Sequence, residues 1–473
     1  MKKIIKVSPS EMEKQREYTE LVRTVLTSRF EPSQPLAFVH TYGCQGNVSD
    51  GERIKGILET LGYGFTDDVE KADLILYNTC AVREHAEDRI YGNVGAIKRL
   101  KKTNPNLIIA LCGCMMQQKR VVDKIRKSYP FVNLVFGTHV IHIIPELIYR
   151  VLCTGKKVYE CPDEAGVIAE DLPIRRDGNI KGWLPIMYGC NNFCSYCIVP
   201  YVRGRERSRE PEDIIKEAKE LIASGCKDIT LLGQNVNSYG KNLDRDINFS
   251  KLLRQINDLP GDFIIRFMTS HPKDCTKELL DTMASCDKVA KHLHLPFQSG
   301  NDRVLKAMNR GYTREKYLEL AKYARQVMPD LSMTSDVIVG FPGETYEEFR
   351  DTVSLIEEVR FTSLFTFIFS PRPGTKAADM PDPISREEKG KWFKELTDAQ
   401  EKIASERTAA MKDKTYTVLC EGYAKDGILN GRTEGNVMIE FPEVEGKELI
   451  GKFCKVRVTE PLTWIVRGVL DER

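Results

Sequence analysis

The sequence predicts an α/β protein made of two regions of parallel sheet followed by a small β-barrel. Three observations support this fold class. Apolar runs alternate with helical stretches from about residue 36 to 152, and the same alternation returns over residues 182–407. After residue 408 the pattern changes to short β-rich runs separated by Gly, Asn and Asp. Strands that alternate with helices are typical of parallel sheets, whereas closely spaced short strands are typical of barrels and sandwiches.

The first region, residues 35–155, is predicted to form a doubly wound parallel sheet. Helices expected at 51–61 and 84–101 separate its apolar runs and would cover the faces of the sheet. Residues 1–34 are expected to be an N-terminal extension with a charged surface helix, and residues 156–181 a polar linker. The expected strands are 37–42, 73–77, 107–111 and 134–136.

The central region, residues 182–407, contains six expected strand–helix units, which predict a (β/α)6 partial TIM barrel. Helices at 211–224 and 345–359 are clear examples of its amphipathic pattern. Residues 408–473 are predicted to close into a small β-barrel. The expected strands are 182–188, 228–232, 263–267, 292–295, 332–339 and 364–369, and in the C-terminal barrel 416–420, 437–440, 453–458 and 464–469.

Composition limits the class of protein. The formal net charge is only +2, so bulk charge does not indicate nucleic-acid binding. The longest apolar run, 107–116, is too short to cross a membrane, and the N-terminus lacks the apolar core of an export signal. A cytoplasmic location without membrane association is therefore expected. Fourteen cysteines in such a protein favour metal binding or catalysis over a disulfide framework.

One cysteine triplet carries a specific pattern. Cys190, Cys194 and Cys197 form C-x3-C-x2-C directly after a predicted strand, at the barrel end where active sites lie. Three thiolates leave one iron of a [4Fe–4S] cluster without a protein ligand. That iron can bind the amino and carboxylate groups of S-adenosylmethionine (SAM), which the cluster can then split. The alternatives are buried structural thiols or a zinc site, but structural zinc prefers four protein ligands and no fourth stands nearby.

Three further cysteines share a context rather than a spacing. Cys44, Cys80 and Cys114 each close an apolar strand of the first region. Because the carboxyl ends of parallel strands meet at one edge of a sheet, these thiols are predicted to converge on a second cluster. The alternative is that each is a small hydrophobic residue at a strand end. Cys112 competes with Cys114, and spacing alone does not decide between them.

Polar residues follow the other barrel strands, where they could hold SAM or a substrate base. The alternative for each is an ordinary strand-end polar group that is hydrogen-bonded locally. These candidates are Gln234, Asn235, Ser270, His271, Gln298, Ser299 and Asp336. Arginines that follow the triplet or lie near the last barrel strand suit RNA phosphates, the alternative being a solvated charged loop. They are Arg203, Arg205, Arg207, Arg209 and Arg372.

Residues 36–473 resemble the methylthiotransferase family of radical SAM enzymes, and most of all its MiaB-type tRNA branch. The matching stretches are 41–47 (TYGCQGN), 78–84 (NTCAVRE), 113–117 (GCMMQ), 189–209, 269–272 (TSHP), 295–301 (LPFQSGN), 336–345 (DVIVGFPGET) and 370–375 (SPRPGT). The resemblance implies that Cys44, Cys80 and Cys114, rather than Cys112, hold an auxiliary cluster, that Tyr196 lies near the SAM adenine, and that the last domain is a TRAM-type RNA-binding module. Two positions depart from the pattern of this branch. Gly46 stands where the branch usually has Met, and Gly51 stands where it often has Ser.

The activity implied by this resemblance is methylthiolation at C2 of N6-isopentenyladenosine in tRNA, 3′ to the anticodon. It would use two [4Fe–4S] clusters and two SAM molecules, one as methyl donor and one as radical source. The expected partners are an isopentenylated anticodon stem-loop and an external electron donor, and the chain is expected to be a monomer. Alternatives are a threonylcarbamoyl-adenosine tRNA or a ribosomal-protein aspartate as substrate, a small-molecule sulfur-inserting enzyme, and a non-catalytic iron–sulfur RNA-binding protein.

Overall fold

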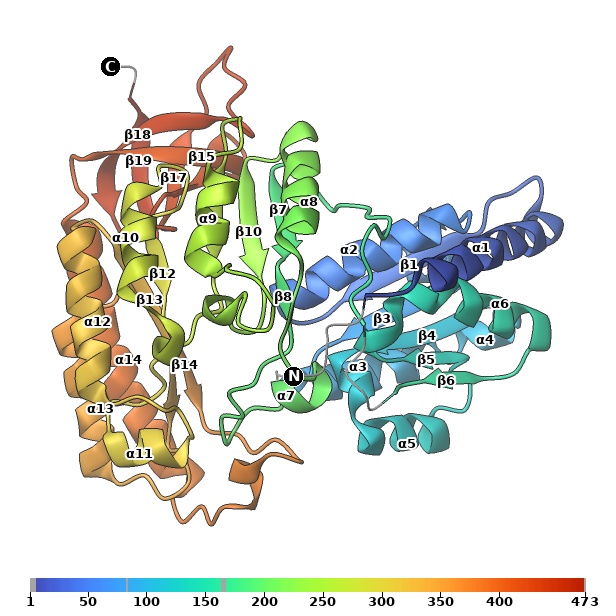
Figure 1. Ribbon diagram of the computed structural model, residues 1–473, viewed down its shortest axis with the longest axis horizontal. Coiled ribbons are helices and arrows are strands. Elements are labelled where there is room, and N and C mark those ends of the chain that lie inside the picture. The colour runs from blue at the N-terminus through green and yellow to red at the C-terminus, as the bar shows by residue number, and fades with distance from the viewer. Residues whose placement is uncertain (1–5, 82–83, 163–166, 472–473) are drawn as a thin grey trace. The chain divides into compact units, whose positions relative to one another are not determined.

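The computed structural model describes residues 6–81, 84–162 and 167–471 (Figure 1). The chain divides into two compact units. The first comprises Met1–Asp177, Met187–Asn191 and Cys197–Arg209, and the second comprises Gly178–Ile186, Asn192–Tyr196 and Glu210–Arg473. Of the family-like stretch 78–84, Val82 and Arg83 lie outside the described residues. Among the described residues, no helix is both long and apolar enough to pass through a lipid bilayer.

The first unit is built on a six-stranded parallel sheet. Its strands are β1 (Leu36–Thr41), β2 (Gly64–Phe65), β3 (Leu74–Thr79), β4 (Ile108–Gly113), β5 (Leu134–Phe136) and β6 (Val158–Glu160), in the order β2-β1-β3-β4-β5-β6. Its helices are α1 (Pro9–Phe30), α2 (Gln45–Thr60), α3 (Glu84–Ile97), α4 (Leu100–Thr103), α5 (Lys119–Ser128), α6 (Ile144–Thr154) and α7 (Val199–Val202).

Apolar cores form on both faces of this sheet, which confirms the doubly wound prediction. Leu74 and Leu76 of β3 point into a core shared with α1, α2 and α6. Ile75 and Tyr77 of the same strand point into a second core shared with α3 and α5. Every residue of β3 and β4 is buried, as expected for central strands covered on both faces. The strand order reverses beside β1, which is the switch point at which such sheets bind ligands.

Two boundaries of the first unit differ from the sequence-based expectation. Val22 and Leu26 of α1 are buried in the same core as α6, so the N-terminal helix is part of this domain and not only a surface extension. Strand β6 pairs in parallel with β5, so the sheet continues into the segment predicted to be a linker. The residues of β6, Val158–Glu160, follow two lysines and end in a glutamate, so they form no apolar run that would reveal the strand before its pairing is known.

The second unit contains the six predicted strand–helix repeats. Its parallel strands are β7 (Lys181–Pro185), β10 (Asp228–Leu232), β11 (Ile264–Phe267), β12 (His292–His294), β13 (Ser332–Val339) and β14 (Ser363–Ile368). The strands pair in the orders β11-β10-β7 and β12-β13-β14, and a parallel bridge between Ile265 and Val289 connects the two groups. The following helices are α8 (Pro211–Ala223), α9 (Phe249–Asn257), α10 (Lys277–Ser285), α11 (Asp302–Ala307), α12 (Arg314–Val327), α13 (Tyr346–Val359) and α14 (Arg386–Ala409). This is the predicted open partial barrel.

The predicted strand at 182–188 is divided in two. Strand β7 ends at Pro185, which has no N–H to donate to a neighbouring strand. The following β8 (Met187–Tyr188) pairs antiparallel with β9 (Arg207–Ser208) and belongs to the first unit. The chain therefore leaves the barrel strand just before the cysteine triplet begins.

The last five strands form the predicted closed barrel within the second unit, although the sequence pattern indicated only four of them and not β16. They are β15 (Thr415–Lys425), β16 (Ile428–Thr433), β17 (Met438–Pro442), β18 (Phe453–Pro461) and β19 (Val466–Leu470), in the order β15-β16-β17-β19-β18. Buried Arg266 of β11 donates from its guanidinium to the carbonyl oxygens of Thr433 and Glu434, at 3.0 Å each. The same side chain forms an ion pair with Asp228 of β10, at 2.9 Å.

Candidate active site

Cys44, Cys80 and Cys114 stand at three neighbouring strand tips of the first unit. Cys44 follows β1 and precedes α2, Cys80 follows β3, and Cys114 follows β4. Strand β1 pairs with β3 and β3 pairs with β4, so the three positions share one edge of the sheet. The approach is close, since a Cβ added at Gly43, whose φ is +118°, would lie 2.9 Å from the Cys80 Sγ. The predicted convergence is therefore supported by the topology.

The chemistry of these thiols fits a polynuclear cluster. Burial raises the pKa of the Cys114 thiol to about 12, the Arg203 guanidinium opposes this shift, and Cys44 and Cys80 add to it. Within the described ranges, no three His, Cys, Asp or Glu side chains lie close enough together to hold a single metal ion. A four-iron cube is wider than one ion and is held by cysteine thiolates, so it suits three tips separated in this way. Cys112, by contrast, packs in the apolar core of β4.

Arg203 connects α7 to this edge of the sheet. Its Nε donates to the Cys114 Sγ at 2.9 Å, and its Nη2 donates to the Asn47 Oδ1 at 2.7 Å. The same Nη2 lies 2.7 Å from the Asp50 carboxylate. Burial opposes the charge of this guanidinium, but Asp50 and Cys114 hold its pKa well above the ordinary value. Arg203 thus brings a permanent positive charge against one thiol of the candidate cluster site.

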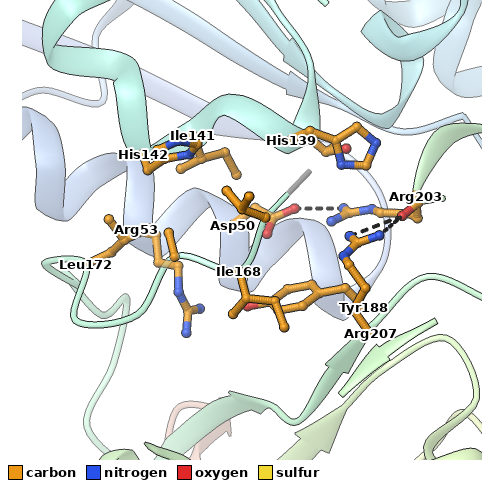
Figure 2. Close-up of a pocket in the computed structure, with 13 residues that line it drawn as sticks. Asp50, Arg53, His139, Ile141, His142, Ile168, Leu172, Tyr188, Arg203 and Arg207 are labelled. Carbon is orange, nitrogen blue, oxygen red and sulfur yellow. Dashed lines mark hydrogen bonds and ion pairs between the residues drawn. The ribbon is translucent and has the colours of Figure 1, made fainter. Parts of the chain in front are cut away.

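A pocket lined by polar and apolar side chains lies beside this ion pair (Figure 2). Figure 2 shows Asp50 facing Arg203, with Arg207, His139 and Tyr188 around them. Arg207 donates to the Arg203 carbonyl oxygen at 3.3 Å. Burial, followed by the charges of Arg207 and Arg203, lowers the pKa of His139 to about 4, so this imidazole is neutral at pH 7. Asp50 is therefore the carboxylate that balances Arg203.

The two glycines that depart from the family pattern have different surroundings. A Cβ at Gly51 would lie 2.4 Å from the Thr41 Oγ1, so a side chain at this position requires Thr41 to move. A Cβ at Gly46 would meet only the Cys44 Sγ, at 3.7 Å, which is ordinary contact. The absence of a side chain at Gly51 therefore leaves room for the Thr41 hydroxyl. Gly46, by contrast, leaves space next to Cys44, which is exposed.

Residues of the Cys190–Cys194–Cys197 loop make hydrogen bonds within the unit to which each belongs. Cys190 N–H donates to the Gly204 carbonyl at 3.1 Å. Ser195 N–H donates to the Met308 carbonyl at 2.9 Å, and its hydroxyl donates to the Ala307 carbonyl at 2.6 Å. Gly189 takes φ +77°, and a Cβ there would lie 2.1 Å from the Arg205 carbonyl oxygen, so only glycine fits. The backbone at Cys190 is thus held within the first unit, and the backbone at Ser195 within the second.

Arg310 is a residue of this site that the sequence does not reveal. It is 4% exposed, and its Nη1 lies 3.3 Å from the Cys194 Sγ and 3.4 Å from the Tyr196 hydroxyl. Its Nη2 donates to the Pro296 carbonyl at 2.6 Å. Tyr196 packs against the same buried apolar cluster as Ile338, a residue near the end of β13. Arg310 follows α11 without any motif, and only the fold brings it to the cysteine loop.

The polar residues after β10 and β11 are the best candidates for a SAM site. Several of their buried side-chain atoms have no hydrogen-bond partner among the described residues, which is unusual unless a ligand or water satisfies them. These atoms are the Asn235 Oδ1, both amide atoms of Asn237, the Thr269 Oγ1, the Ser270 Oγ and the His271 Nε2. Burial, with Arg310 adding to it, lowers the pKa of His271 to about 2, so this imidazole stays neutral. A polar ligand such as SAM fits this set of donors and acceptors.

The remaining predicted positions differ in character. Ser299 is buried. Its hydroxyl accepts a hydrogen bond from the Asn301 N–H and shares another with the Thr352 hydroxyl, which gives it a local structural role. Gln298 adopts φ +68° and exchanges backbone hydrogen bonds with β13. Asp336 lies on β13 with its carboxylate 3.4 Å from the His294 Nε2, and Gln234 is half-buried after β10. Their contacts with SAM or substrate stay predictions.

The five predicted RNA-binding arginines are not equivalent. Arg203 is buried against Cys114 and Asp50, and Arg209 is buried in an ion pair with Glu170 at 2.5 Å, which corrects the prediction of RNA contact for these two. A buried charge must be paired, and here protein carboxylates pair it. Arg205 is exposed, and Arg207 and Arg372 are half-buried, so for these three the prediction stands.

Comparison with known proteins defines the class. A radical SAM superfamily model matches residues 184–356, the uncharacterized protein family UPF0004 matches residues 37–137, and a TRAM domain matches residues 409–470. The structure is similar in fold to the radical SAM methyltransferase TsrM of Kitasatospora setae, with a TM-score of 0.54 and 16% identity over 73% of this chain and 75% of that one. The chain is thus a radical SAM enzyme, which implies SAM and a [4Fe–4S] cluster.

Relatives with curated names narrow the family. The chain is 51% identical to the tRNA-2-methylthio-N(6)-dimethylallyladenosine synthase of Thermoanaerobacter sp. over 92% of both chains. It is 47% identical to the enzyme of the same name from Acetivibrio thermocellus, over 99% of this chain and 98% of the relative. The chain belongs to the family of tRNA-2-methylthio-N(6)-dimethylallyladenosine synthases, in agreement with the resemblance predicted from its motifs.

Proposed function

We propose that this enzyme attaches a methylthio group to C2 of N6-dimethylallyladenosine in tRNA, 3′ to the anticodon. The observation that carries the proposal is the presence of two separate cysteine triads, each with a buried arginine against one thiol, in a chain about half identical to synthases named for this product. One triad alone would account for radical generation but would leave no place for sulfur.

The residues proposed to hold the first cluster are Cys190, Cys194 and Cys197, with Arg310 beside Cys194. When bound there, a [4Fe–4S] cluster with one open iron supplies the electron that splits SAM and so provides a radical able to attack an aromatic C–H bond. Tyr196 would lie near the adenine of SAM. Asn235, Ser270 and His271 would satisfy its polar groups, because their buried atoms otherwise have no partner among the described residues.

The residues proposed to hold an auxiliary cluster are Cys44, Cys80 and Cys114. With three protein ligands, one iron would be open, and such a cluster would hold the sulfur that receives a methyl group from SAM. Arg203 would stabilise negative charge at Cys114, because its Nε already donates to that sulfur. His139 beside Arg203 stays neutral and so does not compete with Arg203 for Asp50.

The remaining parts of the proposal concern partners. The C-terminal barrel would contact the tRNA, although residues 408–473 carry ten Lys and Arg against eleven Asp and Glu. Binding by this module would therefore depend on local segregation of its basic residues. An external reductant would supply electrons, and the enzyme would act as a monomer in the cytoplasm.

The decisive test is mass spectrometry of nucleosides from dimethylallylated tRNA after incubation with anaerobically reconstituted enzyme, SAM and reductant. A new 2-methylthio-N6-dimethylallyladenosine is expected. If SAM is cleaved without that product, the radical chemistry stands and the substrate is wrong, and threonylcarbamoyl-adenosine tRNA is tested next. If SAM is not cleaved at all, the chain is a non-catalytic iron–sulfur protein.

A further inference from the structure

The inner face of the sheet β12-β13-β14 carries a set of side chains that the proposed chemistry does not yet use. Adjacent residues of paired parallel strands point to the same face. Thr334 is paired with His294, and Asp336 and Ile338 of β13 are paired with Phe365 and Phe367 of β14. The ring centroids of His294 and Phe365 are 5.7 Å apart, and the His294 Nε2 lies 3.4 Å from the Asp336 carboxylate. These contacts confirm that the three side chains share one face.

The opposite face of the same sheet is closed. Leu293, Met333 and Val337 point the other way and are fully buried. Helices α12, α13 and α14 follow or precede these strands, and α14 packs on β14. The inner face is therefore the only face of β13 and β14 on which the described structure leaves large apolar side chains open.

Exposure rises across this inner face. His294 is 6% exposed and Thr334 is 7% exposed, whereas Phe365 is 48% and Phe367 is 53% exposed. Large apolar side chains that are exposed to this extent and lie next to each other on one strand face form the kind of contiguous patch that marks a binding surface. Phe365 and Phe367 are called the aromatic wall below.

The aromatic wall leads to the cysteine loop. Ile338, the strand partner of Phe367, packs in one apolar cluster with Tyr196, Phe341 and Phe369. Tyr196 lies between Cys194 and Cys197 in sequence, and its hydroxyl contacts Arg310. A planar group on the aromatic wall would therefore lie along the same face as the residue next to the radical-generating loop.

On the basis of the proposed function, we infer that the aromatic wall contacts the target adenine and its apolar N6 substituent, and that Asp336 discriminates against an anionic N6 substituent. Aromatic side chains stack on bases and make apolar contact with a dimethylallyl group. The Asp336 carboxylate is paired in register with Phe365, so it would lie beside the base edge. A threonylcarbamoyl group carries a carboxylate, and like charges at such a position oppose binding.

The aromatic wall and Asp336 would together distinguish two tRNA substrates that differ only in the group attached to N6. The dimethylallyl group is uncharged and apolar, as the wall requires. The threonylcarbamoyl group is anionic and would face Asp336. The His294 Nε2 lies 3.4 Å from the Asp336 carboxylate, and the His294 Nδ1 lies 3.0 Å from the Thr334 hydroxyl.

The test uses the full-length enzyme and three anticodon stem-loop RNAs that are identical except at the target base, which is adenosine, N6-dimethylallyladenosine or N6-threonylcarbamoyladenosine. Dissociation constants give two ratios for each variant. Phe367→Ala is expected to reduce the preference for dimethylallyl over unmodified RNA about 10-fold, because an apolar group loses its contact surface. Phe367→Leu, which keeps apolar volume, is expected to retain most of that preference. Asp336→Asn is expected to reduce the preference for dimethylallyl over threonylcarbamoyl RNA several-fold.

The control variant is Leu21→Ala, because Leu21 is an exposed apolar residue of α1, 44% exposed, and belongs to the other compact unit. Its ratios should equal those of the wild type, and equal thermal unfolding and iron content identify correctly folded variants. Unchanged ratios in Phe367→Ala and Asp336→Asn overturn the inference while wild-type product formation leaves the proposed function intact. Absence of product from the wild type overturns both. Self-association in sedimentation that Phe367→Ala abolishes assigns the wall to a second copy and also overturns the inference.

Discussion

The two cysteine sites reach a similar local chemistry by opposite routes. Cys190, Cys194 and Cys197 lie within eight consecutive residues, whereas Cys44, Cys80 and Cys114 come from three strand tips that are 36 and 34 residues apart in sequence. Yet each site has one buried arginine whose guanidinium contacts one sulfur, Arg310 at Cys194 and Arg203 at Cys114. The same type of ligand set can therefore be built in two ways. In the loop the short spacing of the chain brings the cysteines together, whereas at the sheet edge the pairing of the strands does so.

The largest expected effect separates the two sites functionally. Cys194→Ala should abolish cleavage of SAM to 5′-deoxyadenosine, because its loop supplies the cluster that the radical chemistry needs. Cys80→Ala should leave SAM cleavage in place and abolish the methylthio product. Each variant should lose about half of the iron of the reconstituted enzyme. Iron content and both products are measured together, with Cys153→Ala, an exposed cysteine outside both sites, as the control. Loss of both activities in both variants would show that the sites are not separable.

The next effect concerns stability at the sheet edge. Arg203→Met should destabilise the apo-protein by about 3–5 kcal/mol, because it leaves the carboxylate of Asp50 buried without its partner. Adding Asp50→Asn should restore much of the loss. Urea unfolding measures both, and Arg16→Met, which removes an exposed helical ion pair with Glu13, should change stability by less than about 1 kcal/mol. Equal effects of Arg203→Met and Arg16→Met would contradict the buried pair.

A pH effect distinguishes the sheet-edge site further. His139 has a folded pKa of about 4 against an ordinary value of 6.5, because it is buried and lies near Arg207 and Arg203. As the pH falls below 6.5, the unfolded chain takes up a proton that the folded chain does not, so stability decreases until about pH 4. The loss is about 1.4 kcal/mol per pH unit, or roughly 3 kcal/mol in all. His139→Gln should flatten this part of the stability–pH curve measured by denaturant unfolding, and an unchanged slope would place the titration elsewhere.

The smallest effect concerns the loop site. Arg310→Gln should lower the rate of SAM cleavage about 10-fold, which corresponds to about 1.4 kcal/mol, because one charge-assisted contact to Cys194 is lost. It should also shift the reduction potential of that cluster to a more negative value, since removal of a positive charge disfavours added electrons. Electrochemistry in a Cys80→Ala background isolates this cluster. Arg245→Gln, a surface change on the same unit, is the control, and equal potentials would show that Arg310 acts only through packing.

The sequence was informative where chemistry is local or where strands have a clear apolar period. The triplet, the three strand-tip cysteines and all three folds were predicted, because spacing and periodicity are visible along the chain. Arg310 was not, since it follows α11 without a pattern, and Arg203 was assigned to RNA because its burial depends on contacts with Cys114 and Asp50 distant in sequence. Side-chain partners of charged residues are tertiary properties, and one sequence does not contain them explicitly.

The contact of Arg266 with the C-terminal barrel has a consequence for how such modules can be exchanged. Its guanidinium binds the backbone carbonyls of Thr433 and Glu434, and no side chain of the small barrel takes part in these two hydrogen bonds. These two hydrogen bonds thus depend on the path of one turn and not on the side chains of its residues. A foreign barrel with the same turn could be grafted after α14 and retain these two hydrogen bonds. Truncation after α14 would instead expose the buried ion pair of Arg266 and Asp228 to solvent.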